Sequence, residues 1–171
     1  RMGRPKNSIV NHKTIDLFDV IVTNPPFGSK IPINDQQILE QFDLAHSWVK
    51  DQHGNWLMNS TKLRGSVPPE QIFIERIVQL LRPGGRAAIV LPDSIFSSPG
   101  LEFIRIWLMR HTHIIASIDL HADTFQPHNG TQCSILFVVK KTTEELQEEQ
   151  NLGFIPDNQI FKAMVDHIGH D

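Results

Sequence analysis

The tetrapeptide Asn24-Pro25-Pro26-Phe27 limits the possible folds of this chain more than any other feature, because it abruptly ends a strand-like apolar run. The run before it, Phe18-Asp19-Val20-Ile21-Val22, has the composition of a buried strand. Neither proline can donate a ladder hydrogen bond and each fixes its own φ, so the strand has to end there. Open α/β sheets place their chemistry at the carboxyl ends of their strands. The sequence therefore predicts such a sheet, with a functional site at residues 24–27.

The tetrapeptide would present three groups together: the Asn24 amide, the Pro25 carbonyl and the Phe27 ring. Two hydrogen-bond acceptors beside an aromatic face suit a planar ring system that carries an amine. An isolated Asn-Pro-Pro is most often an ordinary turn, and Phe27 could instead cap the core. The strand before the motif and the segments after it favour the functional interpretation.

The segment FDVIVTNPPFG, residues 18–28, resembles the catalytic motif of S-adenosylmethionine-dependent N6-adenine DNA methyltransferases. It is most similar to the modification subunit of type I restriction–modification systems. The likeness continues over 71–74 and 80–92 and resumes at 118–120, Phe125 and 131–137. It covers roughly residues 16–141 in the family's order, and an ordered set of segments is far more specific than one tetrapeptide.

The resemblance implies an α/β, Rossmann-like methyltransferase fold of which this chain has only the second half. Residues 1–141 would be the C-terminal half of the catalytic domain, with a mostly parallel sheet that ends in an antiparallel strand pair. Residues 142–171 would be a polar linker and a short terminal helix. Only 23 residues precede Asn24, and none reads as a strand followed by the glycine-rich cofactor loop of the family. We therefore expect an incomplete fragment that is inactive alone.

The resemblance also implies a reaction, the transfer of a methyl group from S-adenosylmethionine to N6 of adenine in DNA. The Asn24 side chain and the Pro25 carbonyl would accept hydrogen bonds from the adenine amine, and Phe27 would stack on the flipped base. Phe125 could form the other wall of the base pocket, or be an ordinary loop phenylalanine that packs on the core. Asn24 and Pro26 could also contact the cofactor. The implied partners are double-stranded DNA and the specificity and restriction subunits.

Two other functions stay open at this point. One is methylation of a different amine or amide, such as a protein glutamine or an RNA base, because those relatives also have an aromatic residue after Asn-Pro-Pro. The other is a non-catalytic assembly fragment, which the missing cofactor loop favours. The long connection over residues 28–69 and the segment 80–92 favour the DNA enzyme.

Other candidate residues have plainer interpretations. Asp93 follows an apolar run and could touch cofactor or substrate, although helix capping is commoner for Asp. Cys133 fits a small core residue, and the neighbouring Ser134 lacks a nucleophile-elbow context. The pairs His111/His113 and His167/His170 lack further ligands at metal-site spacing, so we expect no metal.

Composition is that of a cytoplasmic globular domain. The chain has one cysteine and no apolar stretch near the ~20 residues of a membrane span. Its formal net charge of −3 predicts weak DNA binding by this chain alone, because phosphate neutralisation supplies most non-specific affinity. Basic residues near the start could form a small patch or a solvated tail.

Patterning predicts the elements in order. We expect strands at 16–23, 87–91, 114–120 and 134–139, and helices at 70–82 and from Ser98-Pro99 onward. Helical spacing also predicts one helix within 38–49, a solvated helix or linker over 142–150, and a last helix carrying Ile160, Met164 and Ile168. The first strand would lack its usual neighbour, so the fragment could associate with itself along that edge.

Overall fold

The computed structural model describes residues 17–27, 31–126 and 130–168 of the 171-residue chain. Its helices and strands are, in chain order, β1 (Phe18–Thr23), α1 (Gln36–Leu39), β2 (His46–Lys50), β3 (Trp56–Leu63), α2 (Pro69–Leu80), β4 (Leu81–Pro92), α3 (Ser94–Ser97), α4 (Glu102–His111), β5 (Thr112–Asp119), β6 (Cys133–Lys140), α5 (Thr143–Leu152) and β7 (Phe161–Met164). Three short 3-10 turns, η1 (Asp43–Ala45), η2 (Pro99–Leu101) and η3 (Ala122–Phe125), complete the set. The predicted entry segment at 1–15 lies outside the described residues.

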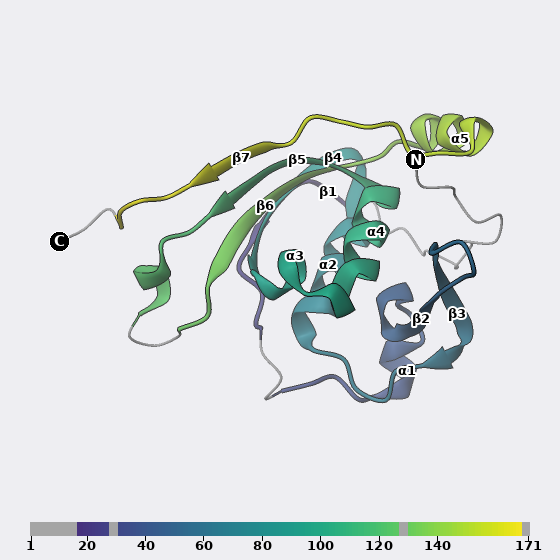
Figure 1. Cartoon of the computed structure of the whole chain (residues 1–171), viewed down its shortest axis with the longest axis horizontal. Coiled ribbons are helices and arrows are strands. Elements are labelled where there is room, and N and C mark those ends of the chain that lie inside the picture. Colours follow the sequence, from purple (N-terminus) through teal and green to yellow (C-terminus); the bar gives the residue numbers. More distant parts are fainter. Residues whose placement is uncertain (1–16, 28–30, 127–129, 169–171) are drawn as a thin grey trace.

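Five strands form one sheet in the order β1-β4-β6-β5-β7. Strands β1 and β4 are parallel, β6 is antiparallel to both of its neighbours, and β7 is parallel to β5. Four strands thus run in one direction and β6 runs against them, which confirms the expected mostly parallel sheet with an antiparallel pair. Helices α2, α3 and α4 lie together on one face of the sheet (Figure 1).

The main core lies between this face of the sheet and the helices α2 and α4. Along α2, Ile74, Ile77 and Val78 follow the i, i+3, i+4 spacing and are buried, as the sequence predicted. Alternate residues of the two central strands pack into the same cluster, namely Ala87, Ile89, Leu91, Leu136 and Val138. Period-2 alternation of the sheet therefore meets the stripe of the helix, as a two-layer α/β packing requires.

Strand β4 begins earlier than predicted, at Leu81 instead of residue 87, because the Pro83-Gly84-Gly85 turn is a bulge within it. Phe18 pairs with Leu81 and Val20 with Arg86, so the turn residues loop out of the ladder. A Cβ on Gly85 would lie 2.8 Å from the Arg82 carbonyl oxygen and 3.1 Å from that of Phe18. Glycine at this position lets β1 and the bulge approach closely.

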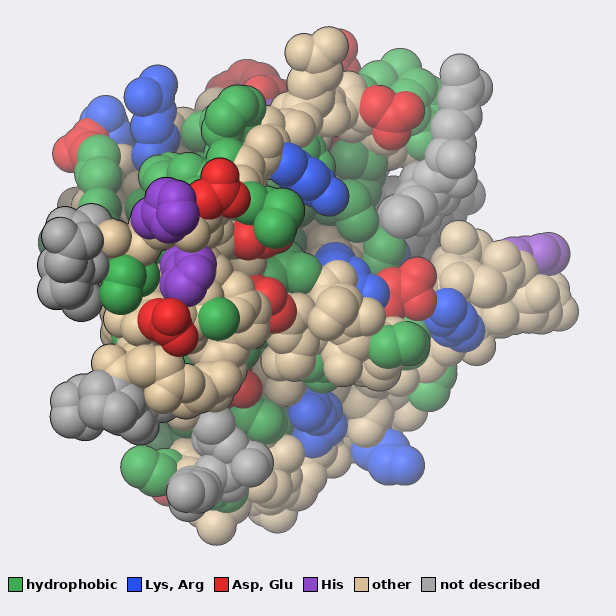
Figure 2. All heavy atoms as spheres, turned by 60° about the vertical axis from the view of Figure 1, so that its left-hand side comes forward, with side chains coloured by type: hydrophobic (Ala, Val, Ile, Leu, Met, Phe, Trp, Pro, Cys, Tyr) green, Lys and Arg blue, Asp and Glu red, His purple; other side chains and the backbone are tan. Residues whose placement is uncertain are grey.

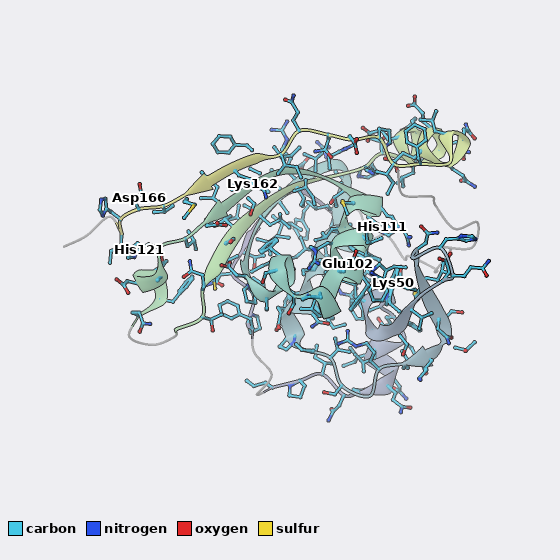
Figure 3. The ribbon with its side chains drawn as sticks, in the orientation of Figure 1. Lys50, Glu102, His111, His121, Lys162 and Asp166 are labelled. Carbon is cyan, nitrogen blue, oxygen red and sulfur yellow. The ribbon has the colours of Figure 1, made fainter. Side chains whose placement is uncertain are left out.

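The helix expected within 38–49 is wrong. The segment forms the short helix α1 and the turn η1, and then Trp48 and Val49 enter β2, which pairs antiparallel with β3. The spacing misled because the buried residues come from three elements. The hairpin packs against α4: the Trp48 ring stacks on Phe103 with centroids 5.8 Å apart. Lys50 and Glu102 also form an ion pair at 2.8 Å between the two elements (Figure 3).

The connection between β1 and α2 is anchored by a buried polar cluster. The Glu75 carboxylate accepts hydrogen bonds from the backbone amides of Asp43 and Leu44, at 3.0 and 2.9 Å. The Asp43 carboxylate in turn accepts one from the Trp107 indole at 3.1 Å. These hydrogen bonds anchor the connection to α2 and α4, so this long segment is an integral part of the fold.

The terminal helix predicted from Ile160, Met164 and Ile168 is also wrong. Residues 161–164 form β7, which extends the sheet beside β5. The apolar residues Ile160, Met164 and Ile168 fit helical spacing. Residues 161–164 nevertheless form a strand, because they pair with β5 at the edge of the sheet. The predicted solvated segment over 142–150 does form a helix, α5, which begins with a capping box at Thr142 and Glu145.

Strand β1 has a free lateral edge and one exposed face. It is the terminal strand of the sheet, bonded to β4 alone among the described strands. Val20 and Val22, which face away from the helices, are 61% and 78% exposed. Ile21, on the other face, packs against the core. The predicted loss of cover at this strand is therefore confirmed for the described part of the chain.

Candidate active site

The Asn-Pro-Pro-Phe motif follows directly on β1, which ends at Thr23. Thr23 pairs with Ile89 of β4, so the motif lies at the carboxyl edge of the two parallel strands. Pro25 is buried, Asn24 and Pro26 are exposed, and Phe27 is half-buried. The buried proline fixes the backbone between two accessible residues, and the Asn24 amide is presented to solvent at the strand end.

Phe27 and Phe125 lie close together although 97 residues separate them in the chain. Their ring centroids are 6.4 Å apart with an interplanar angle of 72°, an edge-to-face arrangement. Both rings are half-buried, so each keeps an accessible part at this edge of the sheet. The structure thus brings together two of the aromatic residues that the sequence singled out, and it places Asn24 three residues before one of them.

Phe125 is held at the end of the η3 turn by local hydrogen bonds. The Thr124 amide and hydroxyl both donate to the His121 carbonyl, at 3.0 and 2.7 Å. The His121 ring accepts from the Asp123 amide at 3.2 Å. Figure 3 shows His121 on this turn, beyond the end of β5. A compact turn of this kind gives the aromatic ring a defined position on an otherwise polar loop.

Asp93 occupies the N-cap position of α3, but its side chain makes no capping hydrogen bond. Its Oδ1 instead accepts a hydrogen bond from the Ser134 hydroxyl at 2.7 Å, and the same hydroxyl lies 2.9 Å from Asp119 Oδ1. Sequence reasoning missed this contact; the available signal was that all three residues sit at strand ends on one edge of the sheet.

Cys133 is a buried core residue, as expected. Its side chain is 2% exposed, and burial together with the nearby Asp93 carboxylate raises the pKa of the thiol to about 11. A neutral thiol of this kind is a poor nucleophile. Cys133 therefore contributes packing to the start of β6.

Two of the histidines considered as metal ligands, His111 and His113, make other contacts. The His111 ring bonds the Trp107 carbonyl at 2.7 Å, and the His113 ring lies 3.0 Å from the Glu145 carboxylate. His170 lies outside the described residues. Among the described residues, no group of three or more His, Cys, Asp or Glu side chains could hold a metal ion.

Charge on the sheet's carboxyl side is mixed. Figure 2 turns this side of the molecule forward and shows Lys and Arg side chains interspersed with acidic ones and with histidines. A nucleic-acid surface normally gathers basic residues on one face.

Within the residues that the structure places, no helix is both long and apolar enough to cross a membrane.

A family model described as N-6 DNA Methylase matches residues 4–167. The chain therefore belongs to the N-6 DNA methylase family. It is 28% identical over 134 residues to the type I restriction enzyme StySPI methylase subunit of Salmonella potsdam, covering 78% of this chain. It is 27% identical over 133 residues to the EcoKI methylase subunit of Escherichia coli K12, covering 77% of this chain. In both cases the match spans 21% of the relative's length.

Solved structures share the fold. A protein from Listeria monocytogenes, described as a class I S-adenosylmethionine-dependent methyltransferase, superposes with a TM-score of 0.65 at 18% identity, over 91% of this chain and 39% of that one. The EcoKI M protein gives a TM-score of 0.51 at 26% identity, over 76% of this chain and 22% of that one. The sheet and helices described above are thus part of a methyltransferase fold.

Proposed function

We propose that this chain carries the catalytic motif of an adenine-specific DNA methyltransferase, the modification subunit of a type I restriction–modification system. The observation that carries the proposal is the pairing of Phe27 with Phe125 at the strand end that bears Asn24. Membership in the N-6 DNA methylase family and the similarity to type I methylase subunits support the same reaction. The chain spans 21% of those subunits, so the activity belongs to a longer assembly.

The proposed chemistry needs no general base with a shifted pKa. The lone pair of the exocyclic adenine amine is delocalised into the ring, which makes this nitrogen a poor nucleophile. Acceptors for both N–H groups favour a tetrahedral nitrogen and stabilise the charge that develops during transfer. We assign these roles to the Asn24 side-chain oxygen and the Pro25 carbonyl, held in place by β1 and the rigid prolines. S-adenosylmethionine supplies the methyl group.

The aromatic pair is proposed to hold the target base. An enzyme that acts on a base has to take it out of the duplex, and the extruded base needs an apolar surface. Stacking on an aromatic ring contributes about 1–3 kcal/mol per base. Phe27 and Phe125 are both half-buried and lie edge to face, so we assign to Phe27 the stacking face and to Phe125 the second wall. Asn24 and Pro26, which are both exposed, are assigned contacts with the cofactor.

Partners follow from the same proposal. The mixed charge of the sheet's carboxyl side suggests that most phosphate contacts come from other parts of the assembly. We propose double-stranded DNA with a flipped adenine as the substrate, and specificity and restriction subunits as partners. A cytoplasmic location fits a buried, reduced cysteine.

The test is Asn24→Ala in the complete protein, measured as transfer of labelled methyl groups from S-adenosylmethionine to adenine in duplex DNA. We expect a loss of about a hundredfold or more, because removal of one preorganised polar group typically has this effect. A matched control is Asn151→Ala on α5, where the side chain only accepts a hydrogen bond from Gln147 on an exposed helix surface. Methylation by the Asn24 variant within about tenfold of the unsubstituted protein would refute the assignment.

A further inference from the structure

A polar junction joins the ends of three strands beside the candidate site. We call it the Ser134 junction; it consists of Ser134 on β6, Asp93 after β4 and Asp119 at the end of β5. The Ser134 hydroxyl lies 2.7 Å from Asp93 Oδ1 and 2.9 Å from Asp119 Oδ1. Ser134 is 1% exposed and pairs with Asp119 on one side and Leu91 on the other. Its single hydroxyl hydrogen is thus shared between two carboxyl oxygens, which come from the ends of the two strands that flank β6.

The junction stands at the base of the loop that carries Phe125. The Leu120 amide donates to the Cys133 carbonyl at 3.0 Å, and the Gln132 side chain donates to the Leu120 carbonyl at 2.5 Å. The Asp93 amide donates to the Gln132 carbonyl at 3.0 Å. Both ends of the loop are therefore fixed relative to the two carboxylates. A shift of either strand end would move the turn that holds Phe125.

Electrostatics make the serine hydroxyl necessary at this place. Two carboxylates brought close together repel each other, and a hydroxyl between them lowers that repulsion by donating its hydrogen. The junction borders a cavity of about 910 Å³ between α4 and β7, which is also lined by Arg105 and Lys162. Arg105 and Lys162 therefore line the same cavity as the two carboxyl groups.

We infer that Ser134 is a positioning residue for the target-base pocket, which sets the place of Phe125 opposite Phe27 by holding Asp93 and Asp119 together. This inference rests on the proposed function. Ser134 itself does not touch the base, because it acts through the loop base. Its removal weakens the link between Asp93 after β4 and Asp119 on β5, across the start of β6, and so loosens the aromatic pair. The Asn24 backbone, which follows β1, stays in place.

The test uses the complete protein with Ser134→Ala, and with Ser117→Ala as the matched control. Ser117 lies on β5 and lines the same cavity. We measure kcat and KM for duplex DNA, the fluorescence of 2-aminopurine at the target position, and the affinity for S-adenosylmethionine. Ser134→Ala should raise KM about threefold to tenfold, the range that one net hydrogen bond supplies, and should reduce the fluorescence in parallel. Cofactor affinity and the control variant should stay within twofold of the unsubstituted protein.

Two rescue variants separate positioning from simple loss of stability. Ser134→Thr keeps the hydroxyl and should restore both KM and fluorescence. Asp119→Asn in the Ser134→Ala background removes one of the repelling charges and should restore part of both. The inference is overturned if Ser134→Ala matches the unsubstituted protein, or if it lowers cofactor affinity as much as DNA affinity. Absence of methyl transfer by the unsubstituted protein would instead overturn the proposed function, and this inference with it.

Discussion

The ion pair between Lys141 and Glu149 fastens α5 to the rest of the domain, and its disruption has a calculable consequence. The two side chains are only 1% and 5% exposed, and Lys141 Nζ lies 2.5 Å from Glu149 Oε1 and 2.7 Å from the Met109 carbonyl. Breaking a buried pair by removing one partner typically costs about 3–5 kcal/mol, because a charge stays buried. Glu149 is the only buried residue of α5, so the helix can detach and relieve part of this cost. We therefore expect Glu149→Gln to lower the free energy of unfolding by about 3 kcal/mol.

The measurement is urea denaturation followed by tryptophan fluorescence and circular dichroism at neutral pH. The surface pair Lys50–Glu102 offers a matched control, with a 2.8 Å contact between side chains that are 48% and 38% exposed. Glu102→Gln should cost less than about 1 kcal/mol, as exposed ion pairs generally do. Replacing both buried partners, Lys141→Met with Glu149→Leu, should recover most of the loss. Equal destabilisation by Glu149→Gln and Glu102→Gln would refute the reasoning.

Three further predictions concern the strand edge, the base pocket and the thiol. Phe27→Ala in the complete protein should reduce 2-aminopurine fluorescence at the target base whereas Phe27→Trp should preserve it, since stacking needs only an aromatic face; equal fluorescence with Phe and Ala would contradict this role. The isolated chain should self-associate along β1 at micromolar concentration and Val20→Lys should suppress this; a stable monomer in sedimentation would refute the open-edge argument. Because the folded pKa of Cys133 is raised to about 11, the thiol is protonated in the folded chain at pH 9 but partly ionised in the unfolded chain. The free energy of unfolding should therefore fall as pH rises from about 8.5 toward 11, and iodoacetamide should modify the folded chain far more slowly than the urea-unfolded chain; equal rates would count against the burial.

Each helix or strand could be predicted from the sequence to the extent that several independent signals agreed on it. At α2 the apolar spacing, the proline at its start and the Pro-Gly-Gly after it all pointed to one helix, and the structure has it at Pro69–Leu80. Over 38–49 only the spacing was available, and it summed residues from a helix, a turn and a strand. The strand β7 was missed because it forms by pairing with β5, and a tertiary contact between distant segments cannot be read from the local apolar spacing.

The candidate site shows the same division. Asn24, Pro25, Pro26 and Phe27 are contiguous, so the motif could be located from sequence. Phe125 could be named only through the family resemblance, since its approach to Phe27 depends on the whole sheet order. The contact of Ser134 with Asp93 and Asp119 joins residues 41 and 15 positions apart, and each is unremarkable in its own segment.

The sheet order also has a consequence for how the molecule opens and closes. Strands β5 and β6 are antiparallel neighbours joined by one loop, whereas β1 reaches β4 only through the long connection over residues 24–80. Local pairings close at lower entropic cost than distant ones, so the β5–β6 ladder should form early during folding and β1 should dock last. Edge strands with one partner open more readily than the central strands of a sheet, so their amide hydrogens exchange faster than those of the central strands. Amide exchange of β1 therefore reports how often the strand that precedes the Asn24–Phe27 motif detaches from β4. A further strand that paired with the free edge of β1 would lengthen the time for which β1 stays docked.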